Sequence, residues 1–328
     1  MTIAFYGRKG CYGRIQYALT VLWLFFVSLS AGAVHAAKDV QQVQKLLRKM
    51  SEAVRELSYH GLFTYEYGGS LDTLKVIHTV REGVEYERLQ HLSGPEREFL
   101  RSGQSVDCLP PGDQLLRGRM LSIGKKSLGL EQNYDFYIRE GERIAGREAV
   151  VLQVVPKDTF RYGYTIGIDV ESGLPLKSLL VGNNKRVLER FQFVELDVGA
   201  VDDEQLQPAY NKHRVAGHQL KNCDNRITPS FSKNWKATWL PKGFLFTGQR
   251  KTESDGDMLM FTDGLTAFSV FIDPVIDKVL LEGKAHRGAT VAFMSRVVKQ
   301  QQPFSVIVVG EIPDVTAQRV ASSIKSIP

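Results

Sequence analysis

Very few side chains in this sequence have the types and spacings that carry out chemistry. His60, His78 and His91 are close in sequence and could meet on adjacent strands, which makes them the one set with the character of a metal site. Histidines in alternating strands are commonly ordinary surface or half-buried residues, so we expect no metal there. Asp202 and Asp203 lie in a polar stretch and are expected to be solvated rather than catalytic.

Catalytic motifs that a single sequence can reveal are absent. The chain has no G-x-S-x-G elbow, no H-E-x-x-H pair, no G-x-x-x-x-G-K-[ST] loop and no dinucleotide fingerprint. We therefore expect no catalytic residue and no cofactor, and a binding protein rather than an enzyme. A secreted hydrolase is the alternative, and loss of an activity on substitution of one Ser, His or Asp would support it.

The first 36 residues have the pattern of a secretory signal peptide. Arg8, Lys9 and Arg14 precede the apolar run IQYALTVLWLFFVSLSAGA, and Val34 and Ala36 are small residues suited to cleavage after Ala36. A retained membrane anchor is the alternative, because the run approaches the length of a spanning helix. Cleavage would leave an exported chain of about 290 residues, which exceeds one typical core and indicates two domains.

Charge and cysteine content limit the class of the exported chain. The signal peptide carries three positive charges and no negative ones, so its removal lowers the formal charge from +6 to +3. Nucleic-acid binding needs a concentrated basic patch and is not expected. Cys108 and Cys223 remain and would be able to pair in an oxidising compartment, although two separate thiols fit the sequence equally well.

Periodicity predicts a helix followed by a long antiparallel sheet. Between Lys38 and Leu57, apolar residues recur at helical spacing with charged residues between them, which predicts one amphipathic helix. From Leu62 to about Val198 the period is two and turn signals such as Gly68-Gly69 recur, so we expect one meander of nine or so strands. The helix is expected to cover the inner face of that sheet. The segment DQLLRGRMLSIG is a candidate second helix.

Composition turns polar from Ala200 to about Arg226, which predicts a linker before a smaller second unit. That unit is expected to hold the strands MLMFT and AFSVFID, a loop through GKAHRG, two further strands, and a final helix opening at Pro313 and Asp314. A small sheet with a terminal helix packed on it follows from this pattern. The predicted organisation is a signal peptide at 1–36, a first domain at 37–200, a linker at 201–226 and a second domain at 227–328.

Ordered sequence patterns stand out in both halves of the chain. In the first half they are Gly61-Leu62-Phe63, Leu71 to His78, Glu87-Arg88-Leu89, Gly94-Pro95 and Arg97-Glu98. In the second half they are W-x-P-x-G-F, from Trp239 to Phe244, and F-T-D-G-L-x-x-F-S-V-F, from Phe261 to Phe271. With these patterns the chain resembles the MucB/RseB family of periplasmic regulators of the envelope-stress sigma factor.

The resemblance implies a fold of the α+β class and a location in the periplasm. Its first domain would be like the lipoprotein carriers LolA and LolB, an unclosed, strongly curved antiparallel sheet around helices, and its second domain would be a smaller α+β unit. It implies a negative regulator that binds the periplasmic domain of an RseA/MucA-like transmembrane anti-sigma factor and protects it from regulated proteolysis. Lipid, lipopolysaccharide or misfolded envelope components would release that partner. The oligomeric state stays open, and a homo-oligomer is compatible with the sequence.

Two sets of residues are candidates for binding. An apolar cleft would suit an amphipathic ligand, and its predicted lining is Phe63, Tyr65, Tyr67, Met120, Leu121 and Ile123. A hairpin in the second domain would present aromatic anchors or a sheet edge to the anti-sigma factor, through Phe261, Asp263, Gly264, Leu265, Phe268 and Phe271. A tight core hairpin explains the second set equally well.

A lipid or lipoprotein carrier is the alternative function. It would share the architecture of the first domain but would not need the second. Deletion of Trp239 to Pro328 is expected to abolish anti-sigma binding in a regulator, whereas a carrier would keep its lipid binding.

Overall fold

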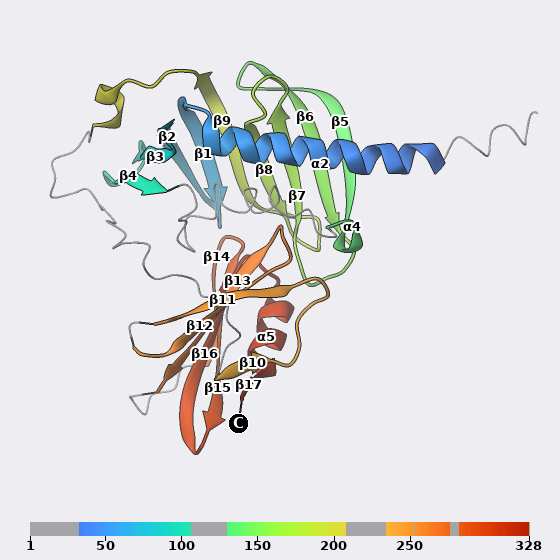
Figure 1. The fold of residues 1–328 in the computed structure, drawn as a ribbon, viewed down its shortest axis with the longest axis vertical. Coiled ribbons are helices and arrows are strands. Elements are labelled where there is room, and N and C mark those ends of the chain that lie inside the picture. Colours follow the sequence, from blue (N-terminus) through green and yellow to red (C-terminus); the bar gives the residue numbers. More distant parts are fainter. Residues whose placement is uncertain (1–32, 106–129, 208–233, 253, 276–281, 328) are drawn as a thin grey trace, which may run out of the picture. The chain divides into compact units, whose positions relative to one another are not determined.

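The computed structural model describes residues 33–105, 130–207, 234–252, 254–275 and 282–327, and the residues from Val43 onward form one compact unit. Two antiparallel sheets, of nine and six strands, make up most of it (Figure 1). The expected α+β fold with a larger first sheet and a smaller second one is confirmed. Within the described ranges, no helix has the length and apolar content needed to cross a bilayer.

Helix α2 (Ala33–Glu56) is the predicted amphipathic helix, although it begins five residues earlier than Lys38. Val43, Leu47 and Met50 follow one another at helical spacing and are buried in one apolar cluster with strand residues such as Leu152 and Ile166. The helix covers one face of the nine-stranded sheet from Val43 onward, as the periodicity predicts. Cleavage after Ala36 stays a prediction.

Nine strands form the first sheet, and their hydrogen-bonded order is β4-β3-β2-β1-β9-β8-β7-β6-β5. The predicted meander would place the first and last strands, β1 and β9, at opposite edges of the sheet. That order is wrong, because β1 and β9 are hydrogen-bonded neighbours. β1 pairs with β9 across 130 positions of sequence, with Phe63 opposite Phe193. The bounds are β1 (Tyr59–Tyr67), β2 (Ser70–Arg81), β3 (Val84–His91), β4 (Glu98–Ser105), β5 (Tyr134–Ile144), β6 (Arg147–Pro156), β7 (Gly163–Asp169), β8 (Pro175–Val181) and β9 (Val187–Val198).

The turn between β1 and β2 is the predicted Gly68-Gly69 pair. Tyr67 is opposite Ser70, so the loop has two residues, and both glycines have positive φ, at 53° and 82°. A turn of this kind matches the right-handed twist of the flanking strands and needs residues that tolerate positive φ at both positions. The two glycines therefore set the register of the first hairpin.

The second sheet has the order β11-β12-β13-β16-β15-β14, and helix α5 (Asp314–Ser323) packs on one of its faces through Ala317, Val320 and Ala321. A separate pair joins β10 (Trp235–Ala237) to a last strand, β17 (Ile324–Ser326), which the sequence did not predict. The other bounds are β11 (Leu245–Lys251), β12 (Asp257–Thr262), β13 (Ala267–Pro274), β14 (Gly283–Arg287), β15 (Thr290–Lys299) and β16 (Gln302–Gly310).

The prediction of a loop through GKAHRG is wrong, because Gly283 to Arg287 form strand β14. All five residues are exposed, and they pair with β15 at the edge of the six-stranded sheet. Its polar, charged composition resembles that of a loop because an edge strand borders solvent, and charges there discourage pairing with other chains.

The start of the predicted linker is held by the first sheet. A short 3₁₀ helix, η2 (Asp203–Leu206), follows β9. Arg81 forms an ion pair with Asp203 and donates to the carbonyl of Val201, and Arg88 donates to the carbonyl of Gln205. Asp203 remains largely exposed, in agreement with a solvated rather than catalytic role.

Strand β7 ends in a buried carboxylate, Asp169, whose pKa predicts how stability changes with pH. Burial by itself would raise the pKa of Asp169, but hydrogen bonds from Arg147 and from Ser172 outweigh it and hold the pKa below its usual value. A lowered folded-state pKa contributes stability that is present above about pH 4 and is lost as the pH falls further.

We expect Asp169→Asn to unfold more easily at pH 7 and to show a shallower loss of stability below about pH 4 than the parent. Urea unfolding at a series of pH values between 7 and 2.5 measures this. Glu171→Gln is the matched control, because Glu171 also contacts Arg147 but is 86% exposed. An identical acid slope in Asp169→Asn and the parent would contradict the assignment.

Candidate functional site

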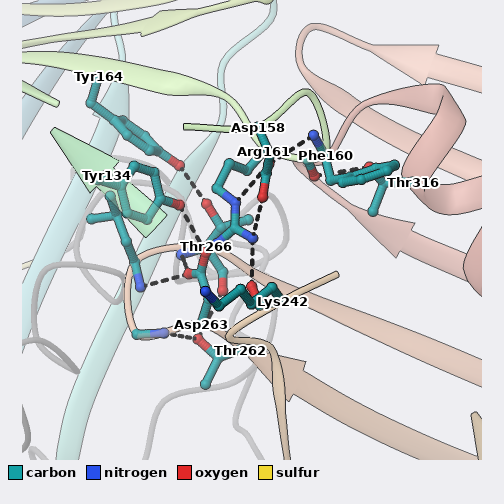
Figure 2. A network of polar contacts seen from close by, with 12 residues as sticks. Tyr134, Asp158, Phe160, Arg161, Tyr164, Lys242, Thr262, Asp263, Thr266 and Thr316 are labelled. Atoms are coloured by element: carbon teal, nitrogen blue, oxygen red, sulfur yellow. Dashed lines mark hydrogen bonds and ion pairs between the residues drawn. The ribbon is translucent and has the colours of Figure 1, made fainter. Parts of the chain in front are cut away.

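Buried polar interactions join the loop between β6 and β7 to the loop between β12 and β13. Arg161 and Asp263 are 102 positions apart in sequence, and both side chains are 0% exposed. The Arg161 Nη1 donates to Asp263 Oδ2 at 2.5 Å (Figure 2). A buried ion pair needs further hydrogen bonds to offset the lost hydration of both charges.

Arg161 has those further partners. Its Nε and Nη2 donate to the two oxygens of Asp158 at 3.0 and 2.9 Å, and Nη2 also donates to the carbonyl of Lys242 at 2.6 Å (Figure 2). The guanidinium carbon lies 5.4 Å from the ring centroid of Tyr134 and 5.2 Å from that of Phe244. Two carboxylates and two aromatic rings therefore stabilise this cation.

Asp263 serves both the ion pair and its own turn. Its Oδ1 accepts the backbone N–H groups of Leu265 and Thr266 at 3.0 and 2.8 Å, which fixes the loop between β12 and β13. Its Oδ2 accepts the Tyr134 hydroxyl at 2.8 Å in addition to Arg161. Burial, and then the neighbouring Asp263 carboxylate, raise the pKa of Tyr134 well above its usual value, so its hydroxyl stays a donor.

Weaker contacts surround this pair. The hydroxyls of Tyr164 and Thr266 are 3.3 Å apart, and the Thr316 hydroxyl donates to the carbonyl of Phe160 at 2.8 Å (Figure 2). The Phe160 ring meets Trp239 edge-on at 5.2 Å, and the exposed Arg319 guanidinium lies 4.1 Å from the Trp239 ring centroid.

A second contact joins the turn between β14 and β15 to strands β1 and β9. The Ala289 N–H donates to Glu189 Oε1 at 2.7 Å, and the Tyr65 hydroxyl donates to Glu189 Oε2 at 2.6 Å. Arg287 donates to the Tyr67 hydroxyl at 3.3 Å and its guanidinium carbon lies 5.2 Å from the Tyr67 ring centroid. Ala289 is buried in the same apolar cluster as Leu152 and Ile166 of the first sheet.

An apolar cavity of about 40 Å³ lies in the nine-stranded sheet beside helix α2. Sites for drug-sized ligands are about 300–1,000 Å³, so the part of this cavity that the described residues line is smaller than such a site. Glu87 is the charged residue at its wall. The apolar lining includes Val54, Tyr59, Phe63, Val76, Leu89 and Phe191.

The three predicted cleft aromatics separate in the structure. Phe63 lines the cavity and is buried, whereas Tyr65 and Tyr67 contact Glu189 and Arg287 as described above. Met120, Leu121 and Ile123 lie outside the described residues, as do Cys108 and Cys223. The cleft set and the disulfide stay predictions.

The six residues predicted to contact the anti-sigma factor occupy four environments. Phe261 and Phe268 are stacked at 5.2 Å in the core beneath α5, and Leu265 is buried in the core of the first sheet. Asp263 binds Arg161, and Gly264 beside it has a φ of +94°. Phe271 is half-buried and points to the face opposite Phe268, since successive strand residues alternate.

The W-x-P-x-G-F pattern also belongs to the Arg161 site. Lys242 supplies the carbonyl for Arg161 and Phe244 supplies a ring, while Trp239 packs on Phe160. Gly243 has a φ of +87°, and a Cβ there would overlap the Asn133 side-chain amide. Only glycine therefore fits at this position between Lys242 and Phe244, the two residues that contact Arg161.

Sequence reasoning missed Arg161, Tyr134 and Glu189. Arg161 stands in PKDTFRYGY, where a cation between two aromatics was the one available signal. Nothing local identifies its partner, because the ion pair forms across 102 positions.

The three histidines considered for a metal do not meet. The ring of His78 is buried between the carbonyl of Leu57, 2.9 Å from Nδ1, and Glu85, 3.2 Å from Nε2. His60 is 3.8 Å from Asp197, and the His91 ring lies beside Phe99. Within the described part of the chain, no three potential ligands gather as a metal site would require.

Family models cover both halves of the chain. The MucB/RseB N-terminal domain matches residues 42–210, and the MucB/RseB C-terminal domain matches residues 229–325. The chain belongs to the MucB/RseB family. The prediction from the sequence patterns is thereby confirmed, and the Arg161 site joins the two family domains.

Known members of the MucB/RseB family align over nearly the whole chain. The sigma factor AlgU regulatory protein MucB of Pseudomonas aeruginosa is 35% identical over 315 residues, covering 93% of this chain and 97% of that protein. The sigma-E factor regulatory protein RseB of Haemophilus influenzae is 27% identical, covering 91% and 96%. The solved MucA/MucB complex of Pseudomonas aeruginosa is similar with a TM-score of 0.67 and 33% identity, covering 88% of this chain and 99% of that one.

Proposed function

We propose that this MucB/RseB protein is a periplasmic negative regulator of a sigma-E-type envelope stress response. It binds the periplasmic domain of a transmembrane anti-sigma factor and protects that domain from regulated proteolysis. The observation that carries the proposal is the match of both family domains, together with a relative that was solved as a complex with MucA.

Binding of the anti-sigma factor is measured with the mature chain, from Ala37, and the periplasmic segment of the anti-sigma factor from the same genome. Isothermal titration calorimetry is expected to give a dissociation constant of micromolar or lower, and the bound segment is expected to resist its protease. Lipopolysaccharide is expected to weaken the binding, since a ligand that favours the free regulator must lower its affinity for the partner. Absence of binding at 100 µM would refute the proposal.

A periplasmic lipid or lipoprotein carrier remains the second candidate. The chain also has the MucB/RseB C-terminal domain, which a carrier would not need, and this favours the regulator. Deletion of the second domain is a poor test between the two, because Leu265 and Ala289 complete the core of the first sheet. Substitutions on the surface of the second sheet avoid that problem.

Phe271 is the hairpin residue we propose as an anti-sigma contact. It lies opposite Met258 on β12 and Ile307 on β16, and Ile307 lies opposite Met294 on β15. Met258 is buried, whereas Phe271, Ile307 and Met294 are half-buried and form the accessible part of this row. Methionine side chains adapt to varied partner surfaces, and buried aromatic anchors contribute most of the free energy at interfaces.

We expect Phe271→Ala to weaken anti-sigma binding about 30-fold, because truncation of an aromatic anchor costs about 2 kcal/mol. Titration calorimetry measures this, and circular dichroism verifies the fold. Leu245→Ala is the control, since Leu245 is a largely exposed residue of β11, an edge strand of the same sheet. Equal affinity of Phe271→Ala and the parent would remove Phe271 from the contact.

A further inference from the structure

We propose that the Arg161–Asp263 ion pair is a latch, and that its opening also releases the Glu189–Ala289 contact. The two contacts come from different loops, between β12 and β13 and between β14 and β15. Both loops belong to one continuous hydrogen-bonded sheet. When both contacts open, the six strands therefore separate from the nine-stranded sheet together. This inference concerns the protein alone and holds whether or not the proposed partner is correct.

The apolar part of the closed contact involves a few residues. The Phe160 ring packs on Trp239, and, among the described residues, the large apolar cluster of the first sheet receives Leu265 and Ala289 from the second sheet. Leu265 and Ala289 are each at the tip of one of the two loops, beside the polar contact that the same loop makes. Apolar burial therefore supplies limited closing free energy, and the polar contacts decide which arrangement the closed form adopts.

A buried ion pair is suited to such a latch. Opening exposes the 0%-exposed side chains of Arg161 and Asp263 to water, and their hydration compensates for much of the lost ion pair. Loss of one partner alone leaves a charge in the closed form with too few counter-charges, so single substitutions favour the open form. Any ligand that binds one form better than the other then shifts the equilibrium by the difference in its affinities.

Hydrogen exchange of the Ala289 amide tests the latch in the complete mature chain. This N–H donates to Glu189, so it reports on the second contact while the substitutions are made at the first. We expect at least tenfold faster exchange in Arg161→Met. In Tyr164→Phe, which removes only the hydroxyl 3.3 Å from Thr266, we expect two- to fivefold faster exchange.

The matched control is Arg190→Met, the same substitution at an ion pair with Glu66 whose side chains are 45% and 52% exposed. Exchange at Ala289 in this variant is expected to stay within twofold of the parent. The double variant Arg161→Met/Asp263→Asn is expected to recover at least half of the change in exchange rate on a logarithmic scale, because it leaves no charge at the two 0%-exposed positions. Asp158 also loses Arg161 in this variant, but its side chain is 28% exposed and keeps contact with water. In that variant the side-chain carbonyl oxygen at position 263 can still accept the turn amides that Asp263 Oδ1 accepts in the parent.

Faster exchange confined to the loop between β12 and β13, with Ala289 unchanged, would overturn the proposal. A double variant that exchanges as fast as Arg161→Met would overturn the role of the buried charges. If Arg161→Met does not fold, Tyr164→Phe decides, and unchanged exchange at Ala289 in that variant refutes the latch.

Discussion

Replacing Phe63 by alanine is expected to lower the free energy of unfolding by about 3–5 kcal/mol. Phe63 is 2% exposed, and its ring centroid lies 4.9 Å from that of Phe191 and 5.8 Å from that of Phe193. The three rings join β1 to β9 at the centre of the sheet. Alanine would remove most of this packing, and the cavity that Phe63 lines would grow.

Urea unfolding followed by circular dichroism measures the loss in Phe63→Ala. Leu71→Ala is the control, since Leu71 is 63% exposed on the adjacent strand β2, and its substitution is expected to change stability by less than about 0.5 kcal/mol. The enlarged cavity is also expected to bind a small apolar probe such as benzene. A decrease of less than about 1 kcal/mol in the free energy of unfolding would show that these three rings contribute little to the packing of β1 against β9.

Gly61→Ala is expected to cost about 3 kcal/mol, at the upper end for overpacking by a single methyl group. A Cβ at position 61 would overlap the carbonyl oxygen of Glu195 and lie 3.1 Å from the Phe193 ring. The first of these atoms is backbone of β9, so relief requires the two strands to separate. Gly61 opens the first family pattern, and this close approach is a physical reason for a glycine there.

Thermal unfolding compares Gly61→Ala with Gly182→Ala. A Cβ at position 182 would meet only side-chain atoms, at 3.2 Å and beyond, so that variant is expected to stay within about 1 kcal/mol of the parent. Equal stability of the two variants would mean that β1 and β9 adjust to one another more freely than their packing indicates.

Local patterns predicted the elements of this protein well and their long-range pairing poorly. Helical spacing in α2 and alternation along β1 follow from side-chain burial within a few residues, which a sequence displays directly. The pairing of β1 with β9 depends on which distant strand completes the sheet. The predicted meander rests on turns between consecutive strands, and such turns do not indicate which distant strand pairs with β1.

The candidate site shows the same division. The F-T-D-G-L pattern marked Asp263, because a short polar turn between apolar strands is visible in sequence. Its burial and its partner Arg161 arise from the docking of two loops across 102 positions, and neither leaves a local signature. Glu189 is likewise one of many acidic residues in strands until Ala289 is placed against it.

The pairing of β1 with β9 also decides when this sheet can form. Phe63 and Phe193 are 130 positions apart, so β1 has no partner on that side until most of the first domain has been synthesised. Contacts of such long sequence separation slow folding, because the intervening chain must be ordered before they form. During that interval the aromatic edge of β1 has no partner on that side and is open to pairing with other chains.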